Sequence, residues 1–144
     1  MPLVAAVLTA VRAAVLAACF AAPQPVAIDG WSADAMEPFI SRDGALLFFN
    51  SSNAPGAQTD LYWARKIDPL HFKLLGPVPG ANSPALDGVA SLAADGTFAF
   101  ISPRDYDARH GTVWTGRWTG AGVTGLALQP QLTRPAPGWF NMDA

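Results

Sequence analysis

The sequence has little charge, little histidine and almost no cysteine, and each shortage excludes a class of protein. Only 14% of the 144 residues are charged, the net charge is −2, and no Lys/Arg cluster exists, so nothing favours nucleic-acid binding. The single cysteine, Cys19, excludes an intrachain disulfide and a multi-cysteine zinc site. His71 and His110 have no further ligand at metal-binding spacing, and phosphate-binding or dinucleotide-binding glycine motifs are lacking. We therefore predict no metal and no cofactor.

The chain is rich in apolar residues, glycine and proline. Hydrophobic residues make up 51% of it, and it contains thirteen glycines and thirteen prolines. Helical soluble domains rarely have this composition, whereas many short strands broken by turns do. We predict an all-β fold after an apolar, helical N-terminal segment.

That N-terminal segment, residues 1–22, is Ala-rich and interrupted by Arg12. A charge near the centre of a membrane span costs about 2.5–3.5 kcal/mol, so an export signal fits better than a span. Leu16-Ala17-Ala18-Cys19 resembles a bacterial lipobox, in which Cys19 would be lipidated and attach the chain to a membrane. We predict a signal peptide or lipoprotein signal, a periplasmic or cell-envelope location, and a linker over residues 23–30; a mis-assigned start codon is the alternative.

Two stretches 52 residues apart share a pattern of strand, tight turn and strand. EPFISRDGALLFF, residues 37–49, is echoed by VASLAADGTFAFI, residues 89–101, and the Asp-Gly turn recurs. Residues 39–65 superpose without a gap on residues 91–117. A period of this length with four strands per unit is typical of propeller blades.

The strands of this pattern also predict the core. The run ALLFF, residues 45–49, does not alternate, so both of its faces should be covered. The gapless superposition places Phe48 on Phe100. Trp63 and Trp114 lie in predicted strands and are expected to be buried.

The first unit resembles the WD40-like (PD40) β-propeller repeat of TolB-like periplasmic proteins. The resemblance rests on Phe39-Ile40-Ser41-Arg42-Asp43-Gly44, then Leu47-Phe48-Phe49, then Asp60-Leu61-Tyr62. The second unit departs from it, with Ala93 at the family's serine and Thr112-Val113-Trp114 in place of D-L-Y. The resemblance implies an exported β-propeller that binds proteins or peptides, and it carries over no catalytic residue.

The repeat divides the chain into two four-stranded antiparallel blades, residues 31–84 and 85–138, followed by the start of a third repeat over residues 139–144. Closed propellers have about four to eight blades. We therefore predict either a truncated chain or one that self-associates through exposed blade faces.

Four residues are candidates for a site, and none of them is assigned a catalytic role. Glu37 and Asp87 could lie at the channel end of the innermost strands, where two carboxylates about 5–10 Å apart would suit glycoside hydrolysis. Loop caps and inter-blade hydrogen bonds are the alternative. Tyr106 and Arg109, in the charged loop over residues 103–111, are of the types that anchor interfaces. A solvated loop is the alternative there.

These features favour a non-enzymatic cell-envelope module that binds a protein, peptide or glycan. The alternative, a remnant of a propeller-fold glycoside hydrolase, rests on fold analogy and unassigned carboxylates. A third option is that an incomplete chain has no activity by itself.

Overall fold

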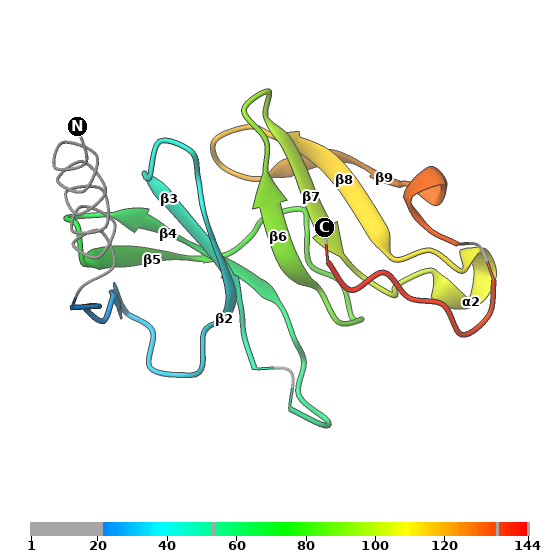
Figure 1. The fold of residues 1–144 in the computed structure, drawn as a ribbon, viewed down its shortest axis with the longest axis horizontal. Coiled ribbons are helices and arrows are strands. Elements are labelled where there is room, and N and C mark those ends of the chain that lie inside the picture. Colours follow the sequence, from blue (N-terminus) through cyan, green and yellow to red (C-terminus); the bar gives the residue numbers. More distant parts are fainter. Residues whose placement is uncertain (1–21, 53, 135, 144) are drawn as a thin grey trace, which may run out of the picture.

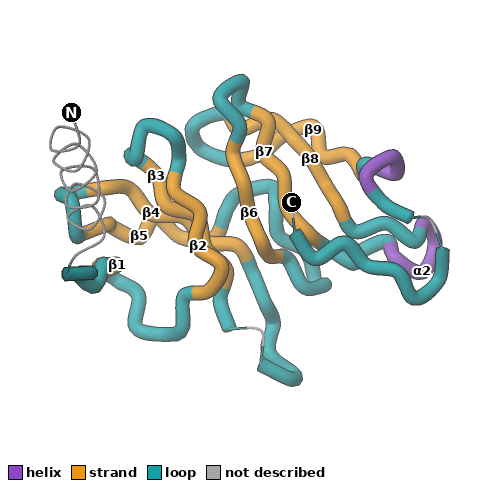
Figure 2. Tube along the Cα trace, in the orientation of Figure 1, coloured by secondary structure: helices purple, strands orange, loops and turns teal. Residues whose placement is uncertain are grey.

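The computed structural model describes residues 22–52, 54–134 and 136–143, which form two β-sheets side by side (Figure 1). The predicted all-β fold is thereby confirmed. The strands form two separate groups, joined by the connection between β5 and β6 (Figure 2). Nearly all of the predicted signal segment, including Cys19, lies outside the described residues.

The first sheet has five strands rather than the predicted four. β2 (Met36–Ile40), β3 (Leu46–Asn50), β4 (Leu61–Lys66) and β5 (His71–Pro77) are antiparallel neighbours. β1 (Ala27–Asp29) adds to the edge of β5 in parallel. β1 falls within residues 23–30, for which a linker was predicted, and its three residues are too few to show a strand pattern in sequence.

The second sheet has the four antiparallel strands expected, in the order β6 (Gly88–Leu92), β7 (Thr97–Ile101), β8 (Val113–Trp118) and β9 (Val123–Leu128). A helical turn, α2 (Tyr106–Arg109), lies between β7 and β8, where a plain loop was predicted. A short 3-10 helix, η1 (Pro130–Leu132), follows β9.

The two sheets repeat each other down to a backbone irregularity. The pairing of β2 with β3 slips between Met36 and Phe39, and that of β6 with β7 slips 52 residues later. Each slip contains a residue with positive φ, Glu37 at 50° and Val89 at 53°. Such a φ is unusual for a side chain other than glycine and is most unfavourable for a β-branched one. Because Val89 shares it, the conformation belongs to the repeat and does not mark Glu37 as functional.

The repeating unit begins earlier than residue 31. In the first unit Ala27 pairs with His71 of β5, and in the second the Val123 amide of β9 donates to the Pro79 carbonyl at 2.8 Å. Each unit therefore opens with a segment that lies against its own outermost strand. The close approach requires glycine at position 80, because a Cβ there would lie 2.2 Å from the Val123 carbonyl oxygen.

The gapless superposition of the two units is wrong by one residue where it places β3 on β7. Ile40 pairs with Leu47, but Leu92, its equivalent, pairs with Phe98 rather than Ala99. The β6–β7 turn is one residue shorter, and the connection after β7 is one residue longer. The counterpart of Phe48 is therefore Ala99.

Two apolar clusters stabilise the structure. The larger fills the space between the sheets and includes Phe48 and Trp63 of the first sheet with Phe98, Phe100 and Trp114 of the second. Leu47 and Phe49 point to the other face, where Ile28 and Trp31 cover them. The predictions that both faces of β3 are covered and that Trp63 and Trp114 are buried are thereby confirmed.

Candidate functional site

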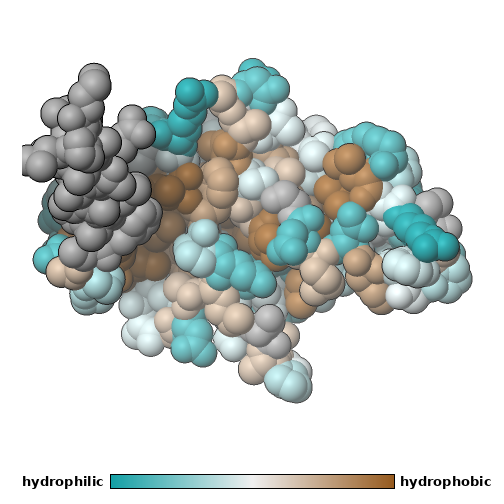
Figure 3. Space-filling view, in the orientation of Figure 1, coloured by the Kyte–Doolittle hydropathy of each residue, from teal (hydrophilic) through white to brown (hydrophobic). Residues whose placement is uncertain are grey.

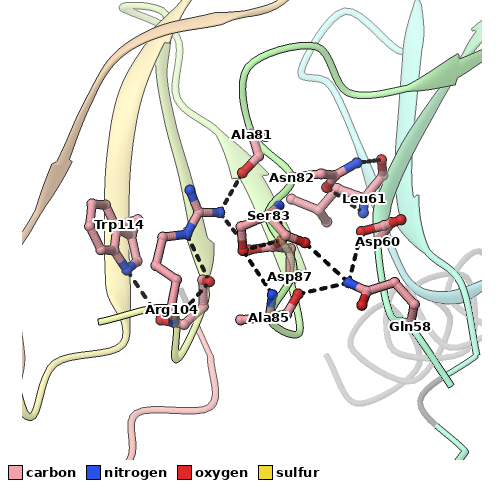
Figure 4. A network of polar contacts seen from close by, with 11 residues as sticks. Gln58, Asp60, Leu61, Ala81, Asn82, Ser83, Ala85, Asp87, Arg104 and Trp114 are labelled. Carbon is pink, nitrogen blue, oxygen red and sulfur yellow. Dashed lines mark hydrogen bonds and ion pairs between the residues drawn. The ribbon is translucent and has the colours of Figure 1, made fainter. Parts of the chain in front are cut away.

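Asp87 lies at the end of the connection between the sheets and is fully buried (Figure 4). One carboxylate oxygen accepts from Nη2 of Arg104 at 2.5 Å. The other accepts from the Ser83 amide at 2.5 Å and the Ser83 hydroxyl at 2.9 Å. With both oxygens occupied and no exposed surface, Asp87 performs a structural role.

Arg104 is held as firmly as its partner. Its Nη2 also donates to the Ala81 carbonyl, and its Nε donates to the Ser102 hydroxyl at 3.0 Å. The guanidinium carbon lies 5.2 Å from the centroid of the Phe100 ring and 5.1 Å from that of Trp114. The ion pair thus attaches the connection over residues 78–87 to the second sheet. The two aromatic rings pack against the guanidinium and shield that part of it from water.

The same connection is also fastened to the first sheet. Asn82 exchanges two hydrogen bonds with the Leu61 backbone, at 2.8 and 3.0 Å. The side-chain amide of Gln58 donates to the carbonyls of Ser83 and Ala85 at 3.1 and 2.9 Å (Figure 4). These polar contacts set the position of one sheet relative to the other.

Glu37 is exposed at a small hollow that it lines with Asn50 and Thr59 among others, and a Cβ added to Gly88, the residue after Asp87, would lie 3.5 Å from its carboxylate. Asp87 does not line this hollow. Glu37 and Asp87 therefore lie near each other, but only Glu37 is open to the hollow, because Asp87 is buried.

Tyr106 and Arg109 both belong to α2 but differ in their contacts. Tyr106 stacks on Phe140 with a centroid distance of 4.1 Å and donates to the Trp139 carbonyl at 3.0 Å, so it holds the C-terminal segment in place. Arg109 is exposed, and its Nε lies 3.7 Å from a carboxylate oxygen of Asp105 on the same turn. Only Arg109 keeps a side chain directed to solvent.

A groove of about 520 Å³ lies between the two sheets, at the end where their hairpin turns lie. Such a volume is within the usual range of ligand pockets. One wall is the β2–β3 turn, the other is the β6–β7 turn, and Trp118 of β8 contributes an aromatic surface. The lining residues are Ser41, Arg42, Asp43, Leu46, Leu92, Ala93, Ala94 and Trp118. We define this set as the turn groove.

The polar edge of the turn groove comes from one turn. The Asp43 carboxylate accepts from the Ser41 hydroxyl at 2.6 Å and from the Ala45 amide at 3.0 Å, and these bonds lower the pKa of Asp43. It is therefore an ionised, fixed acceptor at neutral pH. Arg42 adds exposed donors beside it. On the opposite wall Ala93 takes the place of Ser41, so that wall is apolar.

No site for a metal or a membrane span is evident in the described residues. Among residues 22–143, apart from the two that are not described, no three His, Cys, Asp or Glu side chains gather as metal ligands. In the same part of the chain no helix is long and apolar enough to cross a bilayer.

Comparison with known proteins adds no relative. No family model, curated protein or solved structure matches the chain. The interpretation of the site therefore depends on its geometry.

The turn groove was missed from the sequence. Leu46 and Leu92 read as ordinary strand residues, and Trp118 as one tryptophan among five. The one available signal was the recurrence of equivalent Asp-Gly turns 52 residues apart. In a repeat whose sheets pack side by side, those turns must flank the gap between neighbouring units.

Proposed function

We propose that this protein is a non-enzymatic binding module that holds a segment of a protein or peptide in the turn groove. The observation that carries the proposal is the groove itself, formed where two equivalent hairpins of adjacent sheets face each other. The PD40-like pattern of the first unit supports a propeller-type binding module of the cell envelope. That location follows from the predicted signal segment.

The groove suits an apolar side chain flanked by polar backbone. Its floor is formed by Leu46, Leu92 and Trp118, and one edge carries the fixed Asp43 carboxylate and the Arg42 guanidinium. An inserted side chain would be removed from water, while a carboxylate and a guanidinium are suited to the amide and carbonyl groups of its backbone.

The aromatic wall of the turn groove, Trp118, is preorganised for binding. Trp118 lies 5.1 Å from Phe48 and 5.0 Å from Trp63 in edge-to-face contacts, and stacks on Phe98 at 6.0 Å. These neighbours restrict the indole to one orientation, so less entropy is lost on binding.

The contacts of Asp87 favour a binding role over glycoside hydrolysis. A general acid must reach the scissile oxygen, and a base or nucleophile must reach the sugar or its attacking water. Asp87 is enclosed and paired with Arg104, so that of the two carboxylates only Glu37 is open to solvent. We therefore do not propose the hydrolase.

The test is a selection of peptides that bind the full chain, using a displayed random library and calorimetry on the peptides recovered. Ala94→Arg places a long side chain in the groove at an exposed turn position, and Ala121→Arg is the matched control in the exposed β8–β9 turn. We expect Ala94→Arg to weaken binding by about tenfold or more, which is about 1.4 kcal/mol, and Ala121→Arg to leave it unchanged.

Three outcomes would count against the proposal. The first is that no peptide is enriched, and the second is that both variants bind the recovered peptides equally well. The third is that an array of glycans, and not the peptide library, gives ligands whose binding is lost in Ala94→Arg, which would assign the groove to sugars.

A further inference from the structure

The two walls of the turn groove differ in charge. The β2–β3 turn contributes Arg42 and Asp43, whereas the equivalent residues of the β6–β7 turn are Ala94 and Asp95, of which only Ala94 lines the groove. Apolar surface is visible between the two turns, with hydrophilic side chains at the turns themselves (Figure 3). A ligand that fills the groove therefore meets an apolar wall on the side of the second sheet and a charged edge on the side of the first.

The Asp43 carboxylate is fixed in place but keeps one oxygen for a ligand. Its Oδ1 accepts from both the Ser41 hydroxyl and the Ala45 amide. The Ser41 side chain is itself buried, and its hydroxyl oxygen accepts from the Leu46 amide at 2.9 Å. Among the residues that the structure describes, Oδ2 of Asp43 has no hydrogen-bond partner. This oxygen is a preorganised acceptor at the edge of the groove.

The charge of Asp43 has no counter-charge in the described part of the chain. Asp43 forms no ion pair there, and hydrogen bonds alone lower its pKa, first that of the Ser41 hydroxyl. Lys66 lies beside the same turn, with its Nζ 3.9 Å from where a Cβ on Gly44 would stand, but it does not pair with the carboxylate. An ionised and fixed carboxylate therefore faces the groove with its charge uncompensated.

The equivalent turn of the second sheet shows the opposite arrangement. The pKa of Asp95 is lowered by hydrogen bonds from Thr97 and then by the charge of Arg117. The guanidinium carbon of Arg117 would lie 3.4 Å from a Cβ on Gly96, so a cation of the fold stands beside this turn. Asp95 does not line the groove. The uncompensated carboxylate thus belongs to the one turn of the two whose aspartate borders the groove.

A cation suits the charged edge better than an anion does. Arg42 would attract a carboxylate, but the side-chain hydrogen bonds of this turn are those of Ser41 and Asp43, and the exposed Arg42 side chain keeps its rotamer freedom. Holding it against an anion would cost entropy. The Asp43 carboxylate has already lost that freedom through its own hydrogen bonds.

We propose that the segment bound in the turn groove carries a lysine or arginine beside its apolar anchor, and that this basic side chain pairs with Oδ2 of Asp43. The inference rests on the proposed function and specifies the class of ligand. The anchor lies against Leu92 and Trp118, which line the groove. Asp43 then selects by charge among segments that have a suitable apolar side chain.

The experiment measures binding of the peptides recovered from the library to the full chain, by calorimetry at low and high salt. Asp43→Asn is the variant, and Asp95→Asn, at the equivalent turn position outside the groove, is the matched control. We expect a lysine or arginine next to the apolar anchor of the recovered peptides. Asp43→Asn should weaken binding about two- to fivefold at low salt and less at high salt, as for an exposed ion pair, whereas Asp95→Asn should leave it unchanged.

A double-mutant cycle distinguishes direct pairing from a general effect of charge. When methionine replaces the basic residue of the peptide, the difference between the native chain and Asp43→Asn should disappear. The inference is overturned by recovered peptides that lack a basic residue, by equal affinities of Asp43→Asn and Asp95→Asn, or by a difference that persists with the methionine peptide. Each of these results leaves peptide binding in the groove intact. A library that yields no binder would overturn the inference together with the proposed function.

Discussion

The two sheets follow one plan of strands and turns but differ in the row of side chains on their equivalent faces. In the first sheet the row is Phe39, Phe48 and Trp63, cross-strand neighbours that pack against the second sheet. In the second sheet the equivalent row is small and partly polar, and faces away from the first. It consists of Ser91, Ala99, Thr115 and Ala127.

The difference shows that the order and spacing of the strands do not depend on which side chains pack on the face of the sheet. Both sheets share the strand spacing and the slip at Glu37 and Val89, so the plan does not depend on the aromatic row. The row of the second sheet is suited to water, and Thr115 accepts a hydrogen bond from the Gln129 side chain at 2.6 Å. Self-association through this face would lack the aromatic contacts that join the two sheets.

The largest expected effect comes from removing the centre of the aromatic row. Phe48 is fully buried between the sheets, and Phe48→Ala should lower the free energy of unfolding by about 4 kcal/mol through lost burial and a cavity. Ala99→Ser, at the equivalent place in the second sheet, should change it by less than about 0.5 kcal/mol. Urea unfolding measures both. Similar losses in the two variants would mean that the two faces are equally packed.

A second effect concerns the ion pair, which has no equivalent among the described residues of the first unit, where Ala35 occupies the position of Asp87. Asp87→Asn leaves Arg104 without its counter-charge, and we expect a loss of about 3 kcal/mol in the free energy of unfolding. Asp34→Asn, an exposed carboxylate, is the control and should cost almost nothing. The prediction fails if urea unfolding gives the same midpoint for both variants.

The smallest effect distinguishes the two turns by their acidity. The pKa of Asp43 is lowered first by the Ser41 hydroxyl, whereas that of Asp95 is lowered first by the Thr97 amide. Ser41→Ala should therefore raise the pKa of Asp43 and leave that of Asp95 unchanged, as measured by NMR titration of the carboxyl carbons. An equal change at Asp95 would contradict this.

The sign of the pH dependence follows from the lowered values. Both carboxylates have a lower pKa in the folded state, so each stabilises the fold above the ordinary pKa of aspartate. That contribution is lost as the pH falls through the lowered pKa. In Ser41→Ala the part that depends on Asp43 should be smaller.

The strands and hairpin turns could be predicted because local signals specify them. The register of β7 could not, because the residue missing from the β6–β7 turn is regained in the connection that carries α2, so the period stays at 52. A gapless alignment of the two units conceals the shorter turn and the longer connection, because the two changes in length cancel. The pairing of Asp87 with Arg104 was also hidden, since no spacing links residues on separate connections. Asp87 was singled out in the sequence, but its role depends on that partner.

The opening segment of each unit has a consequence for how the chain folds. Ala27 pairs with His71 and Pro79 accepts from Val123, in each case 44 residues further along the chain. Neither contact can form until the three strands between its partners have been made and ordered. High contact order of this kind slows folding, so each unit should complete late and as a whole. Pro79 and Gly80 belong to the connection between the sheets, so the contact of Pro79 with Val123 also fixes the position of the first sheet. The two units should therefore gain their final stability in one cooperative step.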